Sequence, residues 1–141
     1  DCPPSLGMLT INALSAADNI LIPVQAQYLP AKGMTKLLNT IGKVKHQINP
    51  KVDILGVAIT LANMQTNLGK STVDTIRENY GKHIKVFNSI IPIGVKAAEA
   101  SVSGKSVYQH AKDSNVAKAY EDLTKEIRKI ERSKHKGTPE R

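Results

Sequence analysis

The 141-residue sequence is poor in the side chains that build disulfides, zinc sites and nucleophilic active sites. Its single cysteine, Cys2, excludes an internal disulfide and fits a reducing compartment. The four histidines have no partners at the spacing of metal ligands, which argues against a zinc site. Neither a Ser-His-Asp set nor a Cys-His set can be assigned. The sequence therefore gives no support to covalent catalysis or to a zinc enzyme.

A long hydrophobic run is also missing. No stretch approaches the length of a membrane span, and no charged and then apolar signal peptide leads the chain. Apolar residues still make up 40% of the total, which is enough for one folded domain with a core. We expect a soluble, cytoplasmic protein. The start at Asp1, rather than at a methionine, suggests a processed or truncated product.

Acidic residues are outnumbered: 12 stand against 20 lysines and arginines, for a formal net charge of +8. This excess favours an anionic partner, although charge alone does not choose between nucleic acid and an acidic membrane surface. Residues 32–51 carry five lysines and no acidic residue. That stripe is either a surface for the anionic partner or an ordinary solvated helix face.

Three apolar runs have the length and composition of strands that are buried on both faces, at residues 20–24, 52–61 and 84–91. Helical patterns alternate with them, at residues 6–17, 31–48, 71–80 and 116–130. The first of these helices is expected to be short and largely buried. The third is expected to begin at Ser71, which forms a capping-box pattern with Asp74.

This alternation predicts an α/β fold, a parallel sheet with helices on both faces. One domain is expected over residues 1–132, followed by a disordered basic tail at 133–141. Ligands of such sheets bind at the carboxyl ends of the strands. The loops at Asp1, Asn63 and Pro92 are expected to share that edge.

Gly69-Lys70-Ser71 looks like the end of a phosphate-binding P-loop, but the rest of the motif is absent. The pattern needs a glycine five residues before Gly69, and that position is Met64. A large side chain there is poorly compatible with the backbone of such a loop. We interpret this stretch as the beginning of a helix.

Several motifs taken together resemble the ParA/Soj family of chromosome and plasmid partitioning ATPases. The most specific is residues 1–7, Asp-Cys-Pro-Pro-Ser-Leu-Gly, followed by Leu-Thr-Ile-Asn-Ala-Leu at 9–14 and Leu-Ile-Pro-Val-Gln at 21–25. Later matches are Thr66-Asn67-Leu68, Ile91-Pro92, Glu99-Ala100, Gly104-Lys105, Ala119-Tyr120 and residues 123–126. The resemblance covers the C-terminal part of the family alone. It implies an incomplete, P-loop NTPase-like fold with three layers, α/β/α.

The resemblance also implies roles for residues at the carboxyl edge. Asp1 would be the Walker B aspartate that orders Mg²⁺ through water, and Asp1 with Ser5 would be the catalytic residues. The ATP contacts would be Asp1, Pro3, Pro4, Asn63 and Pro92. Such enzymes act by positioning and charge neutralisation. Because the P-loop is absent, this chain by itself is expected neither to bind ATP tightly nor to hydrolyse it.

DNA binding is implied as well, with two departures from the family. Gln65 and Ile93 stand where arginines would be expected to contact DNA, whereas Lys96 keeps its charge. The candidate contacts to nonspecific DNA are Lys32, Lys36, Lys43, Lys96 and Lys105. Further implied partners are a ParB-like protein and a second copy of the chain, with the protein associated with the nucleoid in the cytoplasm.

Two alternatives remain open from the sequence. One is a MinD-like ATPase that binds a membrane, which residues 133–141 disfavour because they contain no apolar side chain. The other is a non-enzymatic DNA-binding or interaction module with the same fold. In either case the incomplete sheet would expose an open flank, which predicts a dimer or a larger assembly.

Overall fold

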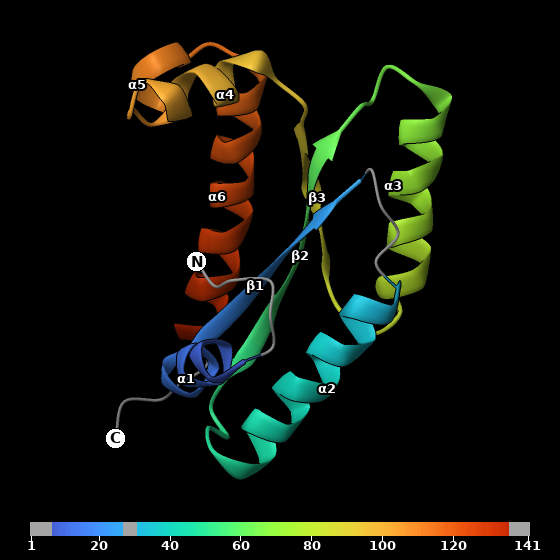
Figure 1. The fold of residues 1–141 in the computed structure, drawn as a ribbon, viewed down its shortest axis with the longest axis vertical. Helices are drawn as coiled ribbons and strands as arrows, with labels where there is room; N and C mark the ends of the chain where they lie inside the picture. Colours follow the sequence, from blue (N-terminus) through green and yellow to red (C-terminus); the bar gives the residue numbers. More distant parts are fainter. Residues whose placement is uncertain (1–6, 27–30, 136–141) are drawn as a thin grey trace.

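The computed structural model describes residues 7–26 and 31–135, so the interpretations of Asp1, Pro3, Pro4 and Ser5 fall outside the described residues. Helices and strands alternate as expected over most of the chain (Figure 1). They are α1 (Met8–Ala16), β1 (Asn19–Gln25), α2 (Ala31–Gln47), β2 (Asp53–Ala62), α3 (Asn67–Tyr80), β3 (Val86–Pro92), α4 (Val95–Val102), α5 (Val107–Ala111) and α6 (Asn115–His135).

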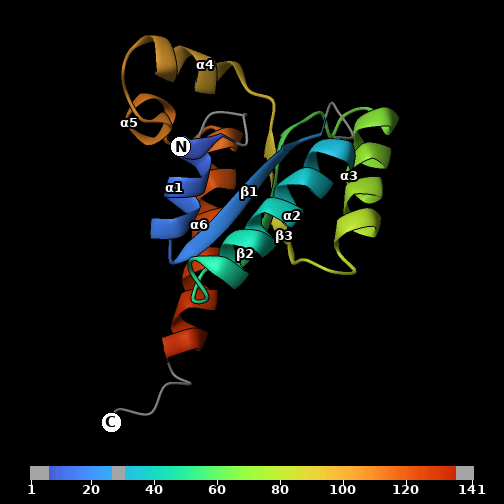
Figure 2. The same cartoon turned by 60° about the horizontal axis from the view of Figure 1, so that its bottom comes forward.

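The three strands form one parallel sheet in the order β1-β2-β3, with helices on both faces (Figure 2). On one face Met34 and Ile41 of α2 and Val73 of α3 join a core that contains strand residues such as Ile59. On the other face Leu123 of α6 belongs to a second core, which includes Phe87. The predicted α/β class with helices on both faces is confirmed.

Gly56 allows β2 to pass close to its neighbours. The register between β1 and β2 shifts after Ile20, so that Leu21 pairs with Gly56. Gly56 has a φ of +150°, and a Cβ at this position would stand 2.7 Å from the carbonyl oxygen of Lys85. Glycine is therefore required at this position, both by the backbone conformation and by the lack of space for a side chain.

The two edges of the sheet differ. In β3 the pairing to β2 is interrupted between Val86 and Ile90, and α6 and α3 contribute side chains that bind the intervening backbone. In β1 no strand among the described residues pairs with the outer edge. An irregular edge strand with occupied backbone groups pairs poorly with further strands. The β1 edge is thus the more open of the two.

Pro23 stands on that open edge. The Ala26 N–H donates to the Thr60 carbonyl of β2 at 2.9 Å, and the Thr60 hydroxyl donates to the Val24 carbonyl at 3.4 Å. Residues 24 and 26 therefore direct their backbone groups toward β2. Because this direction alternates along a strand, Pro23 faces outward, where its missing N–H removes no bond to β2.

The expectation that the first helix is largely buried is wrong. Within α1 only Thr10 and Leu14 are buried, while Met8 and Leu9 are 70% and 71% exposed. A run rich in Ala and Leu predicts a helix but does not say what covers it. Among the described residues, nothing packs over that side of α1.

Three element boundaries also differ from expectation. The helix α3 begins at Asn67 rather than at Ser71, because Thr66 caps it by accepting a hydrogen bond from Gly69 N. Ile48, the last residue of the helical pattern expected at residues 31–48, follows the end of α2 at Gln47 and is 55% exposed. The helix α6 continues to His135, past the boundary expected at residue 132, since its sequence contains no helix-breaking residue before Gly137.

Candidate functional site

The loops after β2 and β3 lie next to each other at the carboxyl edge of the sheet. Ala62, the last residue of β2, pairs in register with Pro92, and Ile93 N donates to the Ala62 carbonyl at 3.2 Å. Asn63 follows Ala62 directly. The structure therefore brings together two of the three predicted loops, and the third, at Asp1, lies outside the described residues.

The turn that begins at Asn63 is held by its own hydrogen bonds. The Asn63 side-chain oxygen accepts from Gln65 N at 3.2 Å, and its carbonyl accepts from the Thr66 hydroxyl at 3.2 Å. Gly69 is buried, and a Cβ there would collide with the Asn63 carbonyl. The Gly69-Lys70 stretch that resembled part of a P-loop thus packs the first turn of α3 against this loop.

The carboxyl edge is apolar where the sequence departs from the ParA/Soj pattern. Leu61, the residue before the end of β2, adopts a left-handed conformation with φ of +51°, which is costly for a residue with a bulky side chain. Exposed large apolar residues stand at the end of β2 and in the segments that follow β2 and β3, namely Leu61, Met64, Leu68, Ile93 and Val95. Gln65 is exposed but neutral. No cation therefore stands at Gln65 or Ile93 to contact a phosphate.

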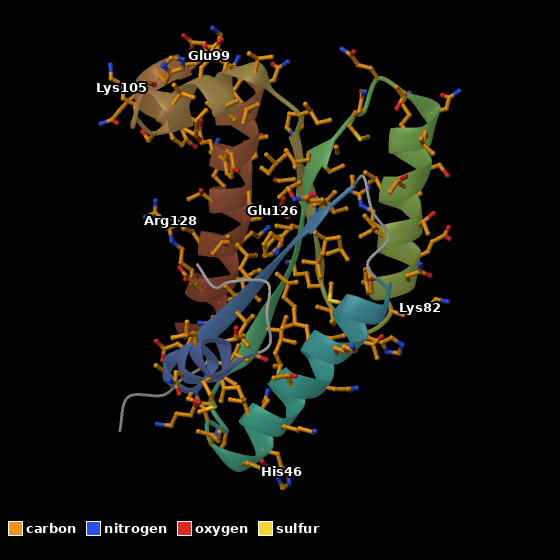
Figure 3. The ribbon with its side chains drawn as sticks, in the orientation of Figure 1. His46, Lys82, Glu99, Lys105, Glu126 and Arg128 are labelled. Carbon is orange, nitrogen blue, oxygen red and sulfur yellow. The ribbon has the colours of Figure 1, made fainter. Side chains whose placement is uncertain are left out.

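The corner formed by α4 and α5 carries a charged cluster centred on Glu99. Its carboxylate contacts Lys96 Nζ at 2.8 Å and His110 Nε2 at 3.0 Å. The hydrogen bond with His110, and then the one with Lys96, lower the pKa of Glu99. Ser106 caps α5 with a capping box, which fixes the corner locally. Lys96 is thus partly neutralised, whereas Lys105 projects from the corner (Figure 3).

The five lysines predicted to contact DNA do not form one surface. Lys32, Lys36 and Lys43 belong to α2, which packs on one face of the sheet. Lys96 and Lys105 belong to the α4–α5 corner at the opposite end of the molecule (Figure 1). Lys36, Lys43, Lys96 and Lys105 are all exposed. The sequence placed them in one set because it gives no information on which face each helix covers.

A cation on α6 was absent from the predicted set. Arg128 is exposed and projects on the same side of the molecule as Lys105 in Figure 3. The helical spacing could have pointed to it, because Arg128 falls outside the apolar seam of Leu123, Ile127 and Ile130. On the exposed side of α6, Lys125 Nζ lies 2.9 Å from Glu121, an i,i+4 ion pair.

The sequence contains no phosphate-binding glycine loop. In the part of the chain that the structure describes, no three His, Cys, Asp or Glu residues are grouped to hold a metal ion. No helix in that same part is long and apolar enough to cross a bilayer.

Both a protein-family model and curated proteins match this chain. A family model described as an AAA domain matches residues 1–54. The sporulation initiation inhibitor protein Soj of Bacillus subtilis is 40% identical over 127 residues, which is 90% of this chain and 49% of that protein. The chromosome partitioning protein ParA of Caulobacter vibrioides is 34% identical over 134 residues, 95% of this chain and 49% of that protein. The chain is homologous to the Soj/ParA partitioning proteins. It spans about half the length of these relatives.

Solved structures support the α/β fold. A cobyrinic acid a,c-diamide synthase from Mycobacterium smegmatis, with bound ATP analogue and magnesium, aligns with a TM-score of 0.68 and 30% identity over 85% of this chain and 42% of that chain. The structure of apo McdA aligns with a TM-score of 0.72 over 90% of this chain and 51% of that chain. At 18% identity, the likeness to McdA shows the fold alone.

Proposed function

We propose that this chain is part of a Soj/ParA-type ATPase that partitions chromosomal or plasmid DNA through ATP-dependent dimerisation and nonspecific DNA binding. The observation that carries the proposal is the similarity to Soj and ParA over at least 90% of the chain. The adjacent loops at Asn63 and Pro92, at the sheet edge where α/β proteins bind ligands, support it.

ATP and Mg²⁺ would be bound by the intact protein at this edge. In that site Asn63 and Pro92 would contact the nucleotide, together with Pro3 and Pro4, while Asp1 would order Mg²⁺ through water. Asp1 and Ser5 would be the catalytic groups. ATP bound there would supply the free energy for dimerisation and, on hydrolysis, for release, and this chain's residues would position the loops around it.

DNA would be bound through phosphates, without base readout, in the cytoplasm at the nucleoid. Two surfaces are available for this role. The first consists of Lys105 and Arg128, with Lys96 weakened by its ion pair to Glu99. The second is the lysine stripe of α2, with Lys36 and Lys43 exposed. A ParB-like partner would stimulate hydrolysis and so release the DNA.

The test measures binding of the intact protein to short duplex DNA of random sequence, with and without ATP, over a range of salt concentrations. Binding is expected to require ATP, and the logarithm of the affinity should fall with the logarithm of salt by about 0.9 per phosphate contact. A DNA affinity that depends neither on ATP nor on the salt concentration would contradict the proposal.

Charge-removing variants then separate the two candidate surfaces. Lys105→Gln combined with Arg128→Gln removes the first surface, and Lys36→Gln combined with Lys43→Gln removes the second. All four side chains are exposed, so the fold should be unaffected. The pair that binds DNA should lower the salt slope by about 1.8, and the other pair should leave it unchanged.

Dimerisation is proposed to follow ATP binding in the intact protein. The open β1 edge adds a second route to assembly when the rest of the sheet is not in place. Light scattering of the 141-residue chain checks this second route, and a strictly monomeric mass would contradict it.

A further inference from the structure

The charge of α6 changes along its length. Residues 118–126 carry two lysines and three acidic residues, whereas residues 127–135 carry four lysines and arginines and one acidic residue. In the first segment the positive charge is compensated, because Lys125 Nζ contacts Glu121 at 2.9 Å and Asp122 at 3.4 Å. The excess positive charge of α6 therefore lies in its carboxyl half.

Three cations of that half, Arg128, Lys129 and Arg132, form what we call the α6 cluster. All three are exposed, and no carboxylate of the described residues forms an ion pair with them. Arg128 and Arg132 stand four residues apart, a spacing at which like charges destabilise a helix. The helix dipole favours cations in the last turn, but Arg128 and Lys129 precede that turn. Contacts within the described part of the protein thus do not explain the cluster.

The helix α6 also continues past the core that it covers. Ile130 is half-buried and packs against the second core, whereas residues 131–133 are exposed. Figure 2 shows the carboxyl end of α6 extending beyond the sheet, and in Figure 3 Arg128 projects away from the sheet. The α6 cluster is therefore open to a large partner.

The side chains of the cluster fit phosphate groups. Two of its three cations are arginines, although the sequence has only four arginines beside 16 lysines. Arginine binds a phosphate through two parallel hydrogen bonds, which lysine cannot do. Arg128 and Arg132 are about 6 Å apart along the helix axis, a length over which one DNA strand presents about two phosphates. A lipid surface is the poorer match, because the apolar side chains of this half, Ile127 and Ile130, pack against the second core.

We propose that the α6 cluster binds the phosphate backbone of duplex DNA. The first DNA surface proposed above then continues from Arg128 along α6 to Arg132. Each arginine holds one phosphate, Lys129 adds positive charge between them, and no base is read. This inference rests on the proposed function, because it assigns further residues to the same DNA contact. An acidic segment of a partner protein is the competing occupant, and the test separates the two.

The test measures binding of the intact protein, with ATP, to a fluorescein-labelled duplex of random sequence over a range of salt concentrations. Lys129→Gln combined with Arg132→Gln should bind about tenfold more weakly or worse at about 0.1 M salt, and its salt slope should be lower by about 1.8. Glutamine is a good helix former and both side chains are exposed, so circular dichroism should show an unchanged helix content.

The matched control is Lys70→Gln combined with Lys82→Gln. These exposed lysines lie in α3 and just after it, and α3 covers the opposite face of the sheet from α6. The control removes the same charge and should bind the duplex as the native protein does.

A competition experiment identifies the occupant. Poly-L-glutamate should displace the labelled duplex at least about tenfold less well than unlabelled duplex of equal charge, because a flexible polypeptide lacks the dense, fixed charge of DNA. Equal competition would assign the cluster to an acidic protein segment and overturn the inference. Unchanged affinity and slope in Lys129→Gln with Arg132→Gln would overturn it too, while leaving the proposed function standing. No duplex binding by the native protein with ATP would overturn both.

Discussion

The carboxylate of Glu126 in α6 lies 2.7 Å from the backbone nitrogen of Ser89 in β3 and accepts its hydrogen bond. Its second oxygen accepts from Asn88 N at 3.1 Å. Both N–H groups fall where the pairing of β3 with β2 is interrupted. Glu126 thus satisfies backbone donors that the sheet leaves without a ladder partner, and it ties α6 to the strand.

Replacing this carboxylate should destabilise the protein. Glu126→Gln removes the charge and replaces one accepting oxygen by an NH₂ group, which cannot accept a hydrogen bond from a backbone N–H. We expect a loss of about 1–2 kcal/mol in the free energy of unfolding. Urea denaturation followed by circular dichroism measures it. Glu131→Gln, an exposed carboxylate on the same helix, is the control and should change stability little.

The same carboxylate predicts a pH dependence. Burial by itself raises the pKa of Glu126, but hydrogen bonds from the Ser89 hydroxyl and from the backbone of Asn88 and Ser89, with the charge of Lys85, outweigh it and lower the pKa. A carboxyl whose folded pKa is lowered stabilises the fold above its unfolded pKa, near 4.3, and loses that stabilisation as pH falls through the folded value. The stability difference between the native protein and Glu126→Gln should therefore be full at neutral pH and shrink on acidification below about pH 4. A difference that is constant with pH would contradict this reading.

Alanine substitutions at two glycines should change the stability of the protein in opposite directions. Gly56→Ala forces a Cβ against the Lys85 carbonyl at a φ of +150°, and we expect a loss of about 2–4 kcal/mol. Gly42→Ala, in open space inside α2, should add about 0.5–1 kcal/mol. Thermal unfolding of both variants tests the contrast. Equal changes in stability for the two variants would show that neither the room for a Cβ nor the backbone φ determines the effect of the substitution.

The cap at the start of α3 should be worth about 1 kcal/mol. Thr66→Ala removes the hydroxyl that accepts from Gly69 N at 3.1 Å and donates to the Asn63 carbonyl. Denaturant unfolding measures the loss, with Thr75→Ala, at a half-buried threonine inside the same helix, as the control. Because the cap holds the Asn63 loop, Thr66→Ala should also weaken ATP binding by the intact protein if that loop contacts the nucleotide. Restored binding in Thr66→Ser would attribute the effect to the hydroxyl.

Removing the charge of Glu99 should strengthen DNA binding if the α4–α5 corner contacts DNA. Glu99→Gln frees Lys96 and removes a negative charge from the corner, so affinity should rise and the salt slope should steepen by about one phosphate contact. Filter binding at several salt concentrations measures both. Glu121→Gln on α6, whose partner is Lys125, is the matched control. Unchanged binding in Glu99→Gln would place the DNA contact elsewhere, with α2 as the remaining candidate surface.

The spacing of apolar residues predicted the helices and strands well, because the burial of a helix face or of a whole strand imposes that spacing. The parallel strands appear as apolar runs, and the α3 residues Val73 and Ile76 are buried as their spacing predicts. Periodicity failed for α1, since Met8 and Leu9 are apolar but stand exposed. Residue type encodes a preference for burial, whereas the covering element is a property of the tertiary fold.

The candidate site was predictable only in part. The neighbouring positions of Asn63 and Pro92 follow from parallel topology, which places all carboxyl ends at one edge. The separation of Lys36 from Lys105 does not follow from sequence, because it depends on which face of the sheet each helix covers. The bond between Glu126 and Ser89, 37 residues apart in sequence, carries no local signal either.

The outward-facing Pro23 gives the β1 edge a means of discriminating between strands. Two copies of β1 laid edge to edge would each lack the donor that proline cannot supply, so both strands would leave a carbonyl without a bond. A different strand that has a bulge opposite Pro23, or that ends there, would lose few backbone hydrogen bonds. The proline thus restricts self-pairing through this edge to registers in which Pro23 lies beyond the end of the neighbouring strand, and it favours a strand shaped to fit.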